Sequence, residues 1–284
     1  MCNNQLPLDK LPYDKIYDDL VHPTAEAVGV VLSLPARYVR QKLSNLEKFI
    51  LEGERNLNQI SETISEKMAD VDPKNIIEPE PYIAVPALQG ISYCMDNNEL
   101  RNLYANLLAT AMQKDKKDSV LPAFAEIIKQ MSPTDAVLMK NLSTNDMYPL
   151  AEARYQKITP SSFASPKVLK SLVTGVSLFQ NLSDVLREKY SINDIAISIE
   201  NLSRLGLIVI SDTYIQNEHA YDNIATMPCC IEWCSSLEVA KSTSVIPEHF
   251  KILEDRINDF EFALIPKSFF MTNFGRLFFN TCVR

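Results

Sequence analysis

Apolar residues recur at helical spacing in the first half of the chain, most regularly between residues 36 and 64. Nine positions there alternate spacings of three and four: Ala36, Val39, Leu43, Leu46, Ile50, Gly53, Leu57, Ile60 and Ile64. This heptad pattern predicts one long helix. We expect the helix to pack inside its own domain, because Gly53 leaves a gap near the centre of the seam. The alternative is a homo-oligomer formed through the 36–64 helix.

Helix-start signals continue this pattern up to about residue 145. A helix is predicted from Pro86 to about Met95, and Asp96–Glu99 has the spacing of a capping box for a helix that follows. Pro122 begins another helix. Ser132-Pro-Thr-Asp135 combines a Ser N-cap, a proline at the first helical position and an acidic third residue. We therefore predict a loosely ordered lead-in at 1–22 and a helical domain at 23–145.

The sequence pattern in the second half of the chain predicts a helix, a glycine and a strand in succession. Gly206 suits the left-handed position after a helix, and Leu207–Ile210 is a short β-rich run. Its partner strand is expected within Phe262–Met271, before a helix capped by Thr272. We predict a linker and first helices at 146–190, then a winged-helix-like domain at 191–284 with a helical insertion at about 213–260. Its expected core is Leu202, Leu205, Ile208, Phe270, Phe274 and Phe278.

The fold class expected from these elements is mainly α, with a small β-sheet in the C-terminal domain. Composition agrees, since 46% of the 284 residues are hydrophobic and 23% are charged, with sixteen prolines against six glycines. The apolar run Ala27–Leu32 is far shorter than the roughly 20 residues of a membrane-spanning helix. Contact of Ala27–Leu34 with a membrane surface, supported only by Arg37, Arg40 and Lys42, is an alternative that we do not favour. We expect a cytoplasmic protein with free thiols.

Binding of DNA is not expected from the charge pattern. The net charge is −8, whereas affinity for the phosphate backbone comes mainly from Lys and Arg. In a winged helix the helix Ile192–Leu205 would be the one to read DNA. It carries Arg204 against Asp194 and Glu200, so a winged-helix DNA-binding regulator is kept only as the alternative function.

Cysteines and histidines gather near residue 230 without the spacing of a known site. Cys229, Cys230 and Cys234, with His219 and His249, lack the paired spacing of structural zinc sites. Cys230 and Cys234 lie one helical turn apart around Trp233, which suits a buried apolar face. A catalytic Cys–His pair formed by Cys234 and His249 would need a third residue to orient the histidine, and the sequence indicates none.

The carboxylates of the long helix are best explained as a solvated face. Glu52, Glu54, Glu62 and Glu66 lie near Lys48, Arg55 and Lys67, as in helices stabilised by i, i+4 pairs. No nucleotide-binding loop or hydrolase motif is found. We therefore predict no catalytic residue, no metal site and no cofactor, and we expect that the protein is not an enzyme.

Four blocks of sequence resemble, in order, the Abi-alpha (abortive infection alpha) family of bacterial antiphage proteins. The blocks are Asn98–Met112, Pro122–Leu138, Asn201–Ile208 and Thr272–Cys282. In abortive infection an infected cell stops phage propagation at its own expense. The resemblance implies a role in defence against phage and supplies no catalytic residues. We therefore predict a non-enzymatic antiphage protein that acts through contacts with a phage or host protein.

Overall fold

A computed structural model of the chain describes residues 63–94, 96–157, 175–217, 219–243 and 257–284. The predicted lead-in at 1–22 and the segment Ala27–Leu34 lie outside these ranges, as does His249. The heptad helix lies outside them too, except for its last positions. Its final seam residue, Ile64, is fully buried in the main core.

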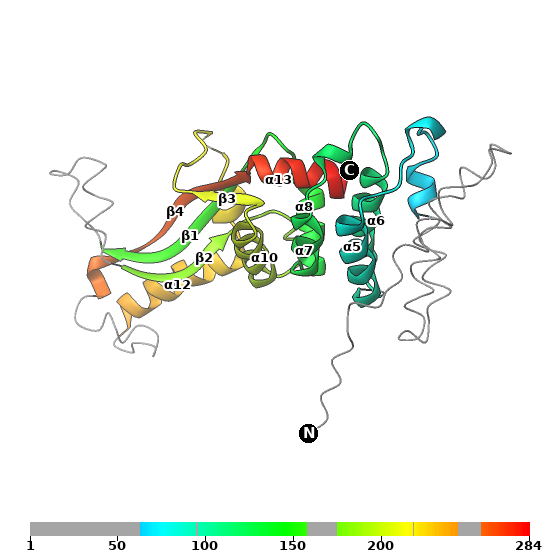
Figure 1. The fold of residues 1–284 in the computed structure, drawn as a ribbon. Helices are drawn as coiled ribbons and strands as arrows, with labels where there is room; N and C mark the ends of the chain where they lie inside the picture. Colours follow the sequence, from blue (N-terminus) through cyan, green and yellow to red (C-terminus); the bar gives the residue numbers. More distant parts are fainter. Residues whose placement is uncertain (1–62, 95, 158–174, 218, 244–256) are drawn as a thin grey trace, which may run out of the picture.

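After the helical residues 63–67, four further α-helices form the first part of the described structure (Figure 1). They are α5 (Pro81–Tyr93), α6 (Asn98–Ala111), α7 (Ala123–Lys129) and α8 (Pro133–Asn141). Helix α5 begins five residues before the predicted start, at Pro81, and keeps Pro86 inside it. Helix α6 is buried along most of its length and is the centre of this part.

Two of these helices begin at predicted capping signals. At α8 the Ser132 hydroxyl accepts from the Asp135 amide at 3.1 Å, and the Asp135 carboxylate accepts from the Ser132 amide at 2.6 Å. This reciprocal box satisfies two amides that the helix itself cannot pair. At α6 the cap is Asn97 instead of Asp96, and its side chain accepts from the amide of Leu100.

Four antiparallel strands form one sheet in the order β2-β1-β4-β3. Strands β1 (Met147–Lys157) and β4 (Phe260–Met271) pair along their whole length, from Met147 with Phe270 to Lys157 with Phe260. Strand β2 (Gly175–Leu182) joins the outer half of β1, and β3 (Ile208–Ser211) joins the last residues of β4.

The predicted fold class, mainly α with a winged-helix-like domain and a small sheet, is wrong. The sheet is built on two long strands, and β1 and β2 occupy the region for which a linker and helices were predicted. Pro149 argued against a strand at β1, because a proline removes a ladder donor, whereas the strand that became β4 was predicted despite Pro266. Each proline lies where its strand has a neighbour on one side only: the β1–β2 ladder begins at Ala151, and the β3–β4 ladder begins at Ser268.

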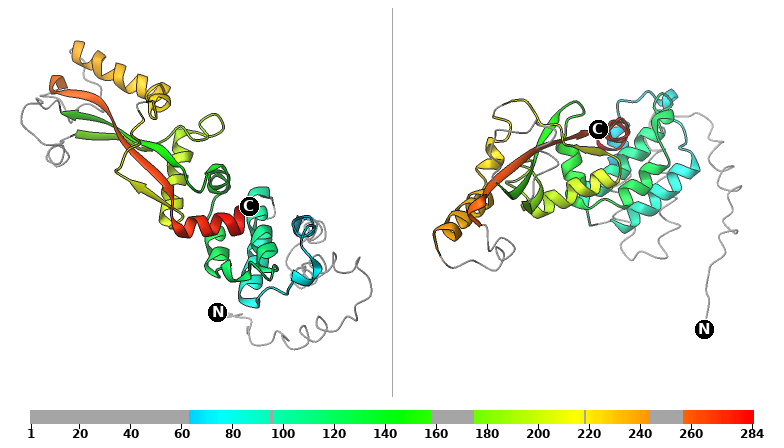
Figure 2. Two further views of the ribbon diagram at one scale, coloured as in Figure 1. Left: turned by 90° about the horizontal axis from the view of Figure 1, so that it is seen from above. Right: turned by 90° about the vertical axis from the view of Figure 1, so that its left-hand side faces the viewer.

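The remaining α-helices lie against the sheet or between the sheet and the helical part. They are α10 (Ile192–Arg204), α11 (Asp222–Ala225), α12 (Pro228–Ser242) and α13 (Asn273–Phe278), which continues as a π-helical turn, η7 (Phe279–Val283). Helix α12 covers one face of the sheet, where Trp233 lies 6.1 Å from Phe179 between ring centroids. Figures 1 and 2 show the sheet extending from the helical part and α13 running from β4 back toward α6.

The main apolar core continues from the helices into the near end of the sheet, and two smaller clusters lie between α12 and the sheet. The main core joins buried residues of α5 to α8 with others from α10, β3, β4 and the C-terminal turn. Of the predicted core residues, Leu202, Ile208 and Phe278 are buried, while Leu205 and Phe274 pack on its margin. Phe270 is only half-buried and its neighbour Phe269 is fully buried, because successive strand residues point to opposite faces.

Candidate functional site

The first and last of the four sequence blocks meet along α6. The side-chain amide of Asn106 donates to the carbonyl of Cys282 at 2.7 Å, and the Thr110 hydroxyl donates to the carbonyl of Thr281 at 2.9 Å. Both side chains are buried. A helix end leaves its last carbonyls without partners, so these two polar residues hold the C-terminal turn against α6.

The second and third blocks meet through a buried carboxylate. Asp135 is 1% exposed and accepts from the Asn201 side-chain amide at 2.7 Å. Asn201 in turn accepts from two nitrogens of Arg204, at 3.0 and 2.8 Å, and Arg204 also donates to Gln130 at 3.1 Å. This network fixes α10 on the start of α8.

The third and fourth blocks meet where β3 begins. Gly206 has the predicted left-handed backbone, with φ of 74°, and its carbonyl accepts from the Thr272 hydroxyl at 2.6 Å. Thr272 also caps α13 by accepting from the amide of Gly275 at 2.8 Å. Gly275 lies so close to the backbone of Leu207 that a larger residue would collide with it.

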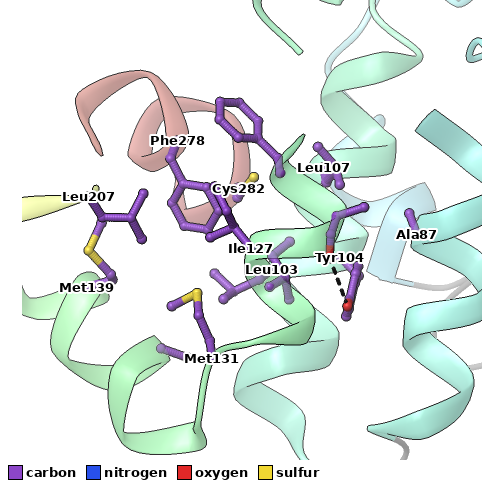
Figure 3. Packing of buried hydrophobic residues seen from close by; sticks show 14 of the residues in the cluster. Ala87, Leu103, Tyr104, Leu107, Ile127, Met131, Met139, Leu207, Phe278 and Cys282 are labelled. Carbon is purple, nitrogen blue, oxygen red and sulfur yellow. Dashed lines mark hydrogen bonds between the residues drawn. The ribbon is translucent and has the colours of Figure 1, made fainter. Parts of the chain in front are cut away.

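Aromatic packing completes the junction by joining the second and fourth blocks. The ring of Phe124 lies 5.5 Å from that of Phe274 and 5.4 Å from that of Phe278, the latter edge to face. Figure 3 shows Phe278 and Cys282 facing Leu103 and Leu107 of α6. The four blocks therefore build one packed junction between the helices and the sheet.

All four blocks of this junction lie within the part of the chain that matches a known protein family. The abortive infection alpha family matches residues 52–282, which covers all four blocks. The chain belongs to that family. No curated protein and no solved structure matches the chain. The four blocks that carry the family resemblance thus consist mostly of residues that pack the junction together.

A polar cavity of about 450 Å³ lies beside the junction. Its walls come from the helical residues 63–67, from α6 and α8, and from the C-terminus. Two lysines and two glutamates line it, together with two asparagines and a small apolar surface: Glu66, Lys67, Glu99, Lys140, Asn102, Asn106, Leu103, Ala136 and Val283, with Thr63 at one edge.

The charges of the cavity are only partly matched to one another. The Lys140 ammonium lies 3.7 Å from a Glu99 carboxylate oxygen, a long and solvated ion pair. Although Lys67 is exposed overall, partial burial lowers its pKa, the nearby Lys140 ammonium lowers it further, and Glu66 opposes both. Asn106 is 5% exposed, and its side-chain oxygen has no hydrogen-bond partner.

Sequence analysis did not find this cavity, because its residues come from four separated segments. In the sequence, Glu66 and the adjacent Lys67 fit the pattern of a solvated helix face. The one residue that could have pointed to the cavity is Asn106, because it is a polar residue in the buried part of α6. The sequence alone does not show that α6 is buried, so Asn106 does not stand out in it.

The cysteines do not form the shared buried face that was predicted. Cys230 is buried and Cys229 half-buried, whereas Cys234 is exposed on α12. Burial and the adjacent Cys229 raise the pKa of Cys230 to about 12. His219 is exposed and contacts Asp222 at 2.8 Å. Within the described ranges, no three His, Cys, Asp or Glu side chains come together as a metal site would require.

Helix α10, the expected DNA-reading helix, is not part of a winged helix. Its basic residue Arg204 is tied to Asn201 and Gln130, as described above. In the part of the chain that the structure covers, no helix has both the length and the apolar character needed to span a membrane.

Helix α12 is apolar on two sides. Its inner side, with Cys230, Trp233 and Leu237, packs on the sheet. On its outer side Ile231 and Val239 are each 58% exposed and lie two turns apart on one row, with the exposed Ser235 between them. A surface helix normally places polar residues on its outer side. The Ile231–Val239 row, bordered by the exposed Glu232 and Glu238, is therefore the candidate surface for contact with a protein.

Proposed function

We propose that this protein is an antiphage protein of the abortive-infection type that acts through protein contacts and not through catalysis. The role is supported by family membership over residues 52–282. The mode of action is supported by the outer row of α12, which exposes two aliphatic side chains beside acidic ones.

The chemistry of this row defines the kind of partner. Ile231 and Val239 would enter a shallow apolar groove, where buried aliphatic area supplies most of the affinity. Glu232 and the Glu238–Lys241 pair, whose atoms lie 2.8 Å apart, would remain at the rim. The chain carries a net charge of −8. The expected partner is therefore a phage or host protein with an apolar groove bordered by lysines and arginines.

The defence role is tested by plating phages on bacteria with and without the gene. Equal plaque numbers across a broad phage panel would refute it. Loss of protection in the double variant Ile231→Glu, Val239→Glu would support action through α12. The matched control is Ile197→Glu on α10, which changes an aliphatic residue of similar exposure, 64%, on another surface.

The variants are informative only if they remain folded. Because their side chains are exposed, each substitution is expected to change the free energy of unfolding by no more than about 0.5 kcal/mol. Trp233 is the only tryptophan of the chain and packs between α12 and the sheet. Its unchanged emission would show that α12 stays in place. Full protection by such a folded double variant would contradict the proposed contact.

A further inference from the structure

One edge of strand β4 lacks a neighbouring strand over most of its length. Strand β1 pairs with the whole of β4, whereas β3 on the other side pairs only with residues 268–271 (Figure 1). The Tyr221 hydroxyl donates to the carbonyl of Lys267 at 2.7 Å, so the loop after β3 reaches that far along the edge. Residues 260–266 therefore form a free edge within the described part of the chain, where only the β1 ladder bonds to their backbone.

The backbone groups that point outward from this free edge follow from the β3 ladder. The amide of Thr272 donates to the carbonyl of Leu207 at 3.1 Å, so the backbone groups of residue 272 point toward β3. Alternate residues of a strand direct their backbone groups to the same side. The even-numbered residues from 260 to 266 therefore point theirs outward, and Pro266 contributes a carbonyl without an amide hydrogen. Such groups can pair with a strand from another chain.

The middle of the free edge lacks the features that usually prevent edge strands from pairing. Those features are charges, prolines and bulges. The register of β4 with β1 continues through residues 260–266 without a shift, so no bulge interrupts it. Glu261 and Pro266 lie near its ends, and the residues between them are all uncharged: Phe262, Ala263, Leu264 and Ile265. The edge is therefore suited to accept a further strand.

We propose that the free edge pairs with the same edge of a second copy of the chain. The two β4 strands are antiparallel and related by a two-fold axis at Ala263, so residue 260 of one copy lies opposite residue 266 of the other. Residues 262 and 264 face each other across the axis and exchange both N–H and C=O groups. Every outward N–H group of the edge thereby gains an acceptor. The small side chain of Ala263 allows close approach at the axis.

Charge complementarity favours a second copy as the occupant. Glu261, Ile265 and Lys267 project from one face of β4, because even numbers of residues separate them. In the antiparallel pair Glu261 lies opposite Ile265 of the partner subunit and diagonal to Lys267 of the partner subunit, within reach of a long side chain. Glu261 is exposed and accepts from the neutral Gln156 at 3.0 Å, while Lys267 pairs with Glu152 at 3.3 Å. The lysine would thus lie between two carboxylates, and symmetry forms this contact twice.

The pairing joins the long strands of both copies into one continuous sheet. Its two-fold axis is perpendicular to the sheet, so each face of one copy continues into the same face of the other. Helix α12 packs on the face that carries Phe262 and Leu264, which places both α12 helices on one side of the dimer. Two Ile231–Val239 rows would then be available to a partner at once. The strand pairing itself does not rest on the proposed function.

Sedimentation of the full chain tests the proposal. We expect a dimer at micromolar concentrations. Glu261→Lys brings two lysines together at both ends of the interface and should weaken the dimer about tenfold. Glu188→Lys is the matched control, because it makes the same change of charge at an exposed residue outside the sheet and should leave the dimer unchanged. A monomer at every concentration, or equal dimerisation of Glu261→Lys and the control, would overturn the proposal.

Mixing two charge variants tests the register. Glu261→Lys and Lys267→Glu chains should form a mixed dimer, because both contacts again join opposite charges; two folded variants that do not associate would contradict the register. Lys267→Glu places a carboxylate beside Glu152. If that variant does not fold, Glu261→Lys still tests the contact, because its side chain is exposed.

Amide hydrogen exchange locates the interface directly. Exchange of residues 260–266 should slow as the dimer forms, because their outward N–H groups become bonded. A dimer in which these amides exchange as fast as in the monomer would place the interface elsewhere, for example along the predicted 36–64 helix, and would overturn the proposal. None of these measurements depends on protection against phage, so this proposal and the proposed function fail independently.

Discussion

Gly275→Ala should destabilise the protein, although alanine is the better helix former. An ideal Cβ at position 275 would lie 2.8 Å from the carbonyl carbon of Leu207 and closer still to its oxygen. Both are backbone atoms of the residue just before β3, so no side-chain rotation relieves the collision. Helix α13 would have to move away from β3, which disturbs the Thr272 contacts and the packing of Phe278.

The size of the effect follows from two opposing contributions. Overpacking of a tight site costs about 1–3 kcal/mol, and a backbone collision belongs at the upper end. Replacing glycine by alanine in a helix returns up to about 1 kcal/mol. The expected net loss is therefore about 2 kcal/mol. With a urea slope of about 3 kcal/mol/M for a chain of this size, the midpoint should fall by roughly 0.7 M.

Circular dichroism during urea unfolding measures this change. Gly206→Ala is the control, because a Cβ there meets no atom within 4 Å and only the positive φ is unfavourable. That strain is expected to cost about 1 kcal/mol. If Gly275→Ala unfolded at the same urea concentration as the natural protein, or at a higher one, the close packing of α13 on β3 would be refuted.

Two further predictions concern caps and pH. Ser132→Ala removes one arm of the capping box of α8 and should cost about 1 kcal/mol in urea unfolding; an unchanged midpoint would show that the box contributes nothing. Burial raises the pKa of Cys94 to about 11 and that of Tyr155 to about 12. The folded state therefore keeps these protons more tightly than the unfolded state, so stability should be constant up to about pH 9 and fall above it. Stability that rises between pH 9 and 11 would contradict this sign.

Short-range signals in the sequence were sufficient where the deciding interaction is itself local. The capping box of Ser132 and Asp135, the cap at Thr272 and the left-handed Gly206 each depend on residues within about one helical turn. The strand predicted within Phe262–Met271 is present as part of β4.

Tertiary structure decided the features that join distant segments. Strand β1 is fixed by pairing with β4, more than a hundred positions later, and Pro149 within it argued against a strand. The side of α12 that faces the sheet could not be read from a helix that carries apolar residues on its outer side as well, at Ile231 and Val239. The cavity exists because Lys67, Glu99, Lys140 and the C-terminus converge on Asn106. The sequence determines which polar, charged and apolar side chains are present. How much each side chain contributes to stability depends on its burial and its partners, which are set only when remote segments pack together.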